Sequence, residues 1–258
     1  MTQRVVHSSL TLLIDSPIDL VLSIAPADLP GLHVEEHLDI LCSGAAVESH
    51  VVSDDHGTRS HRAFIGPGFA TIEYSAIVDG RAKPQPVEEH ELIRYLRPSR
   101  YCESDALAPT ALALFGGLTG MNLLDAVSSW VGTQLTYLRG SSLSTDGAAR
   151  TLLARRGVCR DYAHLCIAML RACGTPARAV SVYAPGLSPM DFHAVCEAYV
   201  DGQWLVVDAT ALAPRGSLLR IATGRDAADT AFLTTLSGSA RSWTSRSPRR
   251  STNSPTTT

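Results

Sequence analysis

Apolar and polar positions alternate through most of the first eighty residues, which is the pattern of half-buried β-strands. The clearest runs cover residues 6–14, 32–40 and 68–78. Glycine and proline residues between the runs supply turn signals. Short strands with regular turns predict a small antiparallel, β-sandwich-like domain over residues 1–80.

The pattern becomes helical in the second half of the chain. Residues 81–105, which include Lys83-Pro84-Gln85-Pro86, are predicted to form a linker with a short helix. Helical spacing then predicts helices at 121–138, 146–155 and 159–173. Strands are expected at 177–183, 193–200 and 203–208, and Asp201-Gly202 predicts a tight hairpin between the last two. Helices followed by an antiparallel sheet predict an α+β domain over residues 106–236.

Composition supports a folded core and argues against a nucleic-acid partner. Hydrophobic residues make up 45% of the chain and charged residues 18%, enough to bury a core. The formal net charge is −3, but residues 237–258 carry four arginines and no acid, which leaves about −7 on the rest. We therefore expect no nucleic-acid binding. Serine, threonine, arginine and proline dominate residues 237–258, which predicts a disordered tail.

Neither a membrane segment nor a cofactor is expected. The first twenty residues contain acids and alternate in polarity, unlike a secretory signal, and no apolar run has membrane-spanning length. A cytoplasmic protein with six reduced cysteines is the resulting expectation. No Cys-x-x-Cys occurs, and His193 and Cys196 would point to opposite faces of a strand, so we expect no metal. The chain also lacks a glycine-rich phosphate loop.

The most informative segment is Gly157-Val158-Cys159, where a cysteine begins a predicted helix. A thiol at a helix N-terminus faces unpaired N–H groups and the positive end of the helix dipole. Both stabilise a thiolate, which is the nucleophilic form of cysteine. Asp161 suits the first turn of that helix and is given a structural role. His164 lies roughly 140° around the helix from Cys159, so the two should not converge.

The hairpin supplies two partners for the cysteine. Its two-residue turn pairs Val200 with Gln203, and counting outward places His193 diagonal to Asp208 on one face. A carboxylate there can fix the imidazole tautomer and stabilise the imidazolium. Taken alone, each residue would be given a structural role. Together, in the order Cys159, His193, Asp208, they predict a thiol acyl-transfer or hydrolytic enzyme.

The backbone N–H of Cys159 is expected to donate to an oxyanion. The second donor is left open, with Tyr137, Trp130 and the Ser141-Ser142 pair as candidates.

These motifs resemble the transglutaminase-like superfamily of microbial cysteine enzymes. The matching segments are 157–165, 171–178, Phe192-His193-Ala194 and 202–210. The resemblance implies a papain-like α+β core over residues 106–236, preceded by a β-rich region, with a catalytic triad at Cys159, His193 and Asp208. The chain differs where many members have tryptophan (here Val195), where many have proline (here Ala209), and after Leu236, where relatives usually continue with a strand.

The resemblance also implies the reaction class. We expect a cysteine-dependent amide-bond hydrolase or acyltransferase that forms a thioester acyl-enzyme, with peptidase or amidase activity favoured and a peptide or protein as substrate. A non-catalytic protein-interaction module on the same fold is the alternative from a different class. An arylamine N-acetyltransferase is disfavoured because its Arg-Gly-Gly-x-Cys lead-in is not matched by Arg155-Arg156-Gly157-Val158-Cys159. The oligomeric state stays open.

Overall fold

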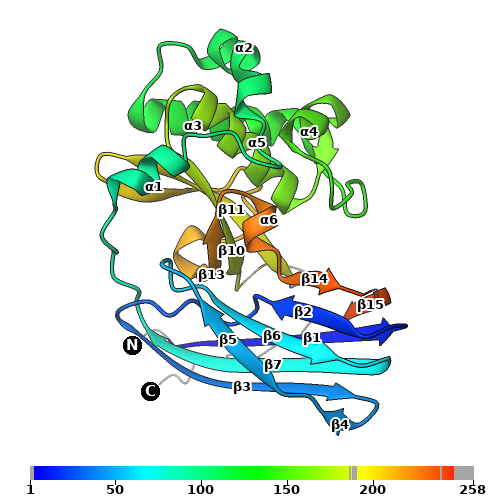
Figure 1. The fold of residues 1–258 in the computed structure, drawn as a ribbon. Coiled ribbons are helices and arrows are strands. Elements are labelled where there is room, and N and C mark those ends of the chain that lie inside the picture. Colours follow the sequence, from blue (N-terminus) through cyan, green and yellow to red (C-terminus); the bar gives the residue numbers. More distant parts are fainter. Residues whose placement is uncertain (1–2, 186, 188–190, 239, 247–258) are drawn as a thin grey trace, which may run out of the picture. The chain divides into compact units, whose positions relative to one another are not determined.

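The computed structural model describes residues 3–185, 187, 191–238 and 240–246. Contacts divide the chain into two compact units. Unit 1 combines the chain up to Pro84 with the segment that begins at Phe232, and unit 2 holds residues 85–187 and 192–231. Each unit is described by itself below, and both are drawn in Figure 1.

Unit 1 consists of two antiparallel sheets, as the alternating pattern predicts. The five-stranded sheet has the order β15 (Ala240–Arg246), β1 (Gln3–Ile14), β7 (Gly68–Gly80), β3 (Leu32–Cys42), β4 (Ala45–Ala46). The four-stranded sheet has the order β14 (Leu233–Ser237), β2 (Ile18–Leu22), β6 (Arg59–Ile65), β5 (Ser49–Ser53). Every second residue of β1 and β7 is buried, for example Leu10, Leu12 and Ile72. Period-two burial is what two sheets that share one core require.

The end of the chain differs from the prediction. Residues 240–246, expected to be disordered, form β15 and pair with β1 along Ser9–Ile14. Strand β14 pairs with β2, so the segment from Phe232 belongs to unit 1 and not to the predicted 106–236 domain. The composition argument failed because an outer strand needs only backbone hydrogen bonds to an exposed sheet edge, not an apolar sequence. The rest of the predicted tail, 247–258, lies outside the described residues.

The predicted linker over residues 81–105 is also corrected. Its short helix is present as α1 (Glu89–Arg94), but the segment from residue 85 onward is part of unit 2. Tyr95 and Cys102 are fully buried there. Residues that pack into a core are not a linker. The proline-rich beginning of the segment is typical of a linker and led to the wrong prediction.

Unit 2 places a helical layer against an antiparallel sheet. Besides α1, its described helices are α2 (Ser104–Phe115), α3 (Gly120–Gln134), α4 (Ala148–Ala154), α5 (Cys159–Ala172) and α6 (Ala227–Thr230), with a 3₁₀ turn at Arg215–Ser217. The sheet has the order β12 (Gln203–Val207), β11 (Phe192–Val200), β10 (Ala177–Tyr183), β13 (Leu219–Gly224). A short parallel pair, β8 (Thr136–Tyr137) and β9 (Arg156–Gly157), precedes α5. The predicted α+β class is confirmed.

Helix α5 is the centre of unit 2. Residues from Asp161 to Arg171 are all buried, so the helix is covered on every side. Its apolar side chains share a core with Leu123 of α3 and with Cys196 of β11. Such a helix is held by tertiary packing on all faces, and its first residue is therefore rigidly placed.

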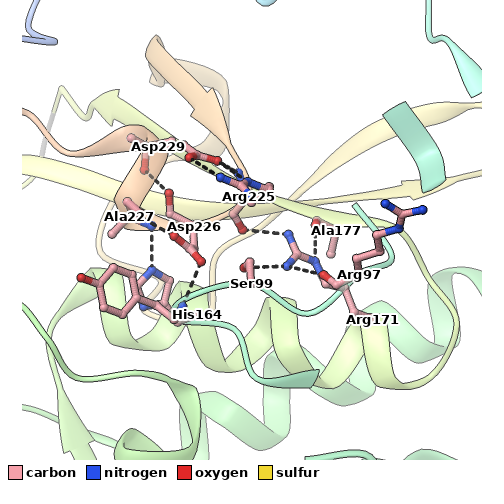
Figure 2. A network of polar contacts seen from close by, with 12 residues as sticks. Arg97, Ser99, His164, Arg171, Ala177, Arg225, Asp226, Ala227 and Asp229 are labelled. Atoms are coloured by element: carbon pink, nitrogen blue, oxygen red, sulfur yellow. Dashed lines mark hydrogen bonds and ion pairs between the residues drawn. The ribbon is translucent and has the colours of Figure 1, made fainter. Parts of the chain in front are cut away.

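Two buried polar side chains connect α5 to distant segments of unit 2 (Figure 2). The Arg171 guanidinium donates to the carbonyls of Ala177 (2.8 Å), Arg97 (3.0 Å) and Arg225 (2.7 Å). The His164 ring accepts from the backbone N–H of Ala227 at 3.1 Å. Burial lowers the pKa of His164 to about 3, which keeps this imidazole neutral. Both groups hold loops around the helix.

Among the described residues, no single helix has the length and apolar character needed to cross a membrane; the bent pair α2 and α3 meets that test together, by length and composition only.

Candidate active site

Local hydrogen bonds shape the chain as it enters α5. The Asp161 carboxylate, which is fully buried, accepts the backbone N–H of Val158 at 2.7 Å. The carbonyl of Gly157 accepts the N–H of Leu138 at 2.9 Å and extends the β8–β9 pair. Asp161 therefore has the structural role given to it from the sequence, and Cys159 is the first residue of the helix. The Cys159 side chain is half-buried.

Gly157 is required by close packing against Asp161. A Cβ atom at position 157 would lie 2.6 Å from Asp161 Cβ, well inside van der Waals contact. We expect Gly157→Ala to displace the Asp161 carboxylate and to lower the free energy of unfolding by about 1–3 kcal/mol. Urea denaturation measures the loss, and Gly174→Ala, with open space around its Cβ but a positive φ of 82°, is the comparison for backbone strain alone. Equal losses in both variants would contradict the steric explanation.

The hairpin that carries the other two residues has the predicted register. Val200 pairs with Gln203, and the ladder runs to the Cys196–Val207 pair. Asp201 and Gly202 both have positive φ, 51° and 81°, as a two-residue type I′ turn needs. Strand β12 ends at Val207, so Asp208 is the first residue beyond the sheet.

The structure brings His193 and Asp208 into contact. The His193 Nε2 atom lies 3.0 Å from Asp208 Oδ2. The His193 residue has no exposed surface, and Asp208 is only 6% exposed. A buried carboxylate at this distance fixes the ring orientation and leaves Nδ1 as the nitrogen available for chemistry.

Electrostatics join His193 to Cys159 as well. Burial lowers the pKa of His193, but hydrogen bonding with Asp208 and Cys159 and the charges of both groups outweigh burial and raise it to about 9. For Asp208, burial raises the pKa, whereas hydrogen bonds from His193 and Thr210 lower it more, so the net pKa is below the ordinary value. The arrangement therefore favours an imidazolium between a carboxylate and a sulfur atom.

The other sequence candidates lie in structural contacts. His164 stacks on Tyr101, with ring centroids 5.5 Å apart, in the network of Figure 2, and does not join Cys159. Trp130 packs edge-on against Phe115 in the core. The Ser142 hydroxyl accepts from the Arg160 guanidinium at 3.2 Å.

Thr210 was missed by the sequence argument. Its hydroxyl donates to Asp208 Oδ1 at 2.6 Å and its N–H donates to the same oxygen at 2.9 Å. A threonine two residues after a carboxylate is a local turn pattern, and that signal was available in the sequence.

Comparison with known proteins gives consistent results. Residues 116–209 match the transglutaminase-like superfamily. A crystal structure of a "putative cysteine protease" from Cytophaga hutchinsonii superposes with a TM-score of 0.84 and 32% identity, over 95% of this chain and 91% of that one.

Two mycobacterial proteins match over shorter stretches. An uncharacterized protein of Mycobacterium tuberculosis is 44% identical over 63 residues, 24% of this chain and 20% of that protein. An uncharacterized protein of Mycobacterium leprae is 29% identical over 120 residues, 42% of each. The matched part thus spans a fifth of the first relative's length and less than half of the second's.

The α+β unit, whose central helix begins at a cysteine and whose sheet bears a histidine on β11, has the transglutaminase-like fold. The chain belongs to the transglutaminase-like superfamily. The family predicted from the motifs is therefore confirmed.

Proposed function

We propose that this protein is a cysteine-dependent amide-bond hydrolase, a peptidase or amidase, with Cys159 as nucleophile, His193 as acid and base, and Asp208 as the group that orients His193. One observation carries the proposal. A buried imidazole is hydrogen-bonded to Asp208 at 3.0 Å and interacts electrostatically with a cysteine at the first position of a buried helix. Helix N-termini and adjacent imidazolium groups are the two environments that activate cysteine.

The reaction would proceed in two steps. Cys159 Sγ attacks the amide carbonyl carbon, the C–N bond breaks, and the His193 imidazolium gives its proton to the leaving nitrogen. A thioester and a neutral imidazole result. Water then attacks the thioester and gives a proton to His193, and the C–S bond breaks to release the acid. The Cys159 backbone N–H, at the helix start, would donate to the oxyanion in both steps.

Capture of the acyl group by an amine instead of water would make the same site an acyltransferase. We favour hydrolysis, and a peptide or protein as the acyl donor. A cytoplasmic location, where thiols stay reduced, belongs to the same proposal.

The first test is the pH dependence of iodoacetamide alkylation at Cys159, followed by mass spectrometry in wild type and His193→Ala. Because the imidazolium persists up to about pH 9, we expect rapid alkylation at pH 6 in wild type and a strong decrease in the variant. Cys173, half-buried near the other end of α5, is the internal control, because burial raises the pKa of its thiol.

Slow alkylation at pH 6 in both proteins, increasing only near the pKa of a free thiol, about 8.5, would contradict the catalytic proposal. It would favour the alternative of a binding module on an enzyme's fold. Rapid alkylation lost in His193→Ala would justify a screen of peptide substrates, with and without added amine to separate hydrolysis from acyl transfer.

A further inference from the structure

The two oxygens of the Asp208 carboxylate have different partners. Oδ2 faces His193 Nε2 at 3.0 Å. Oδ1 accepts two hydrogen bonds from a single residue, Thr210, one from the hydroxyl at 2.6 Å and one from the N–H at 2.9 Å. Two donors on one oxygen fix the plane of the carboxylate and hence the direction of the other oxygen.

The hydroxyl does more than close a turn. An N–H bond to an aspartate two residues earlier already makes the local turn, and any residue except proline supplies it. The Thr210 hydroxyl oxygen also accepts the N–H of Leu212 at 3.4 Å. Since that bond occupies a lone pair, the hydroxyl proton is left for Asp208. Only serine or threonine at position 210 can make this second bond to Oδ1.

Packing behind the turn limits movement of its backbone. A Cβ atom at Gly132 of α3 would lie 2.9 Å from the carbonyl oxygen of Ala209, so the helix backbone approaches the 208–210 segment closely. The segment follows directly on the end of β12 at Val207 and packs closely against α3 at Gly132. With the backbone constrained, the direction of the carboxylate depends on its own hydrogen bonds.

We propose that Thr210 is a positioning residue for the reaction: its hydroxyl orients Asp208, and Asp208 in turn orients the His193 imidazole. This inference rests on the proposed function. Thr210 need not touch the substrate or the reacting atoms. Without the Thr210 hydroxyl, Asp208 Oδ1 keeps only the N–H donor and the carboxylate rotates more freely. Asp208 Oδ2 then spends less time in line with His193 Nε2. The weakened contact then stabilises the imidazolium less.

The test compares Thr210→Val, which keeps the shape and removes the hydroxyl, with Thr210→Ser, which keeps the hydroxyl. The readouts are the NMR titration midpoint of the His193 ring nitrogens and the alkylation rate of Cys159 at pH 6. Thr133→Val makes the same change at an exposed hydroxyl that donates to the Trp130 carbonyl at 2.9 Å, and is the matched control. Thr210→Ala also removes the hydroxyl and replaces Thr210→Val if that variant does not fold.

We expect Thr210→Val to lower the titration midpoint of His193 and to slow the alkylation of Cys159 about tenfold. Tenfold is near the smallest effect expected for the loss of a hydrogen bond to a charged group. Thr210→Ser and Thr133→Val should match wild type. A wild-type midpoint well above the ordinary value of about 6.5 that stays unchanged in Thr210→Val would overturn this inference alone, even if the melting temperature fell. An ordinary midpoint in wild type would overturn the proposed function together with it.

Discussion

Replacing His193 with alanine is expected to lower kcat/KM for amide hydrolysis by about 10³- to 10⁴-fold. The variant loses the imidazolium that accompanies the Cys159 sulfur and the proton donor for the leaving nitrogen. It also leaves the Asp208 carboxylate buried without its ring partner. Initial rates of hydrolysis of a peptide from the substrate screen measure the loss, and Cys159→Ala serves as the inactive reference. Activity within a few-fold of wild type would assign the acid–base role to another group.

The pH dependence of the same reaction follows from the sign of the His193 shift. The pKa is raised to about 9, so the imidazolium is present below that pH and is lost as the pH increases through it. The basic limb of kcat/KM should therefore lie near pH 9. Asp208→Asn removes the negative charge that raises the His193 pKa against the effect of burial. The basic limb of this variant should therefore move to lower pH. By linkage, the stability that this ion pair contributes is complete below the unfolded pKa of about 6.5 and is lost towards pH 9.

Replacing Arg171 with methionine is expected to lower the free energy of unfolding by about 3–5 kcal/mol. Arg171 is 4% exposed, and its guanidinium donates hydrogen bonds to three backbone carbonyls and to the Ser99 hydroxyl (Figure 2). Removing the donor takes a partner from one buried and three part-buried acceptors, and an unpaired buried acceptor is the costly way to lose a hydrogen bond. Arg171→Lys should recover little, because one ammonium cannot reach acceptors spread around a planar fork.

Denaturation in urea measures this loss, and Arg225→Met is the matched control. Arg225 is also an arginine of the network, but its side chain is 53% exposed and its partner is Asp229, four residues on. Exposed pairs of this kind contribute less than about 1 kcal/mol. Similar midpoints for the two variants would show that burial of the Arg171 network contributes little.

Local signals in the sequence were sufficient to predict the hairpin register and the start of the helix that position the candidate site residues. The Asp201-Gly202 turn determines the hairpin register, and the register places His193 near Asp208. Helical periodicity predicts where α5 begins, and Asp161 reinforces that start by accepting the N–H of Val158. Each of these inferences needs only residues close in the chain.

Features that depend on distant contacts were not predictable in this way. Strand β15 exists because β1, more than two hundred residues earlier, offers a free edge. The segment around Tyr95 and Cys102 looks like a linker until its partner Arg171 is placed beside it. Close approach of Gly132 to Ala209 likewise involves positions 77 residues apart. Local pattern carries no information on such pairs.

Unit 1 is assembled from both ends of the chain, which has a consequence for the order of events on the ribosome. Strands β1 to β7 are synthesised before unit 2, but β14 and β15, one on the edge of each sheet, are synthesised after it. Unit 2 can therefore complete its core while both sheets of unit 1 still expose an open edge. Until translation reaches residue 246, those unpaired edges can form β-sheet hydrogen bonds with strands of other chains. They are therefore the part of unit 1 where chaperone binding would best prevent aggregation.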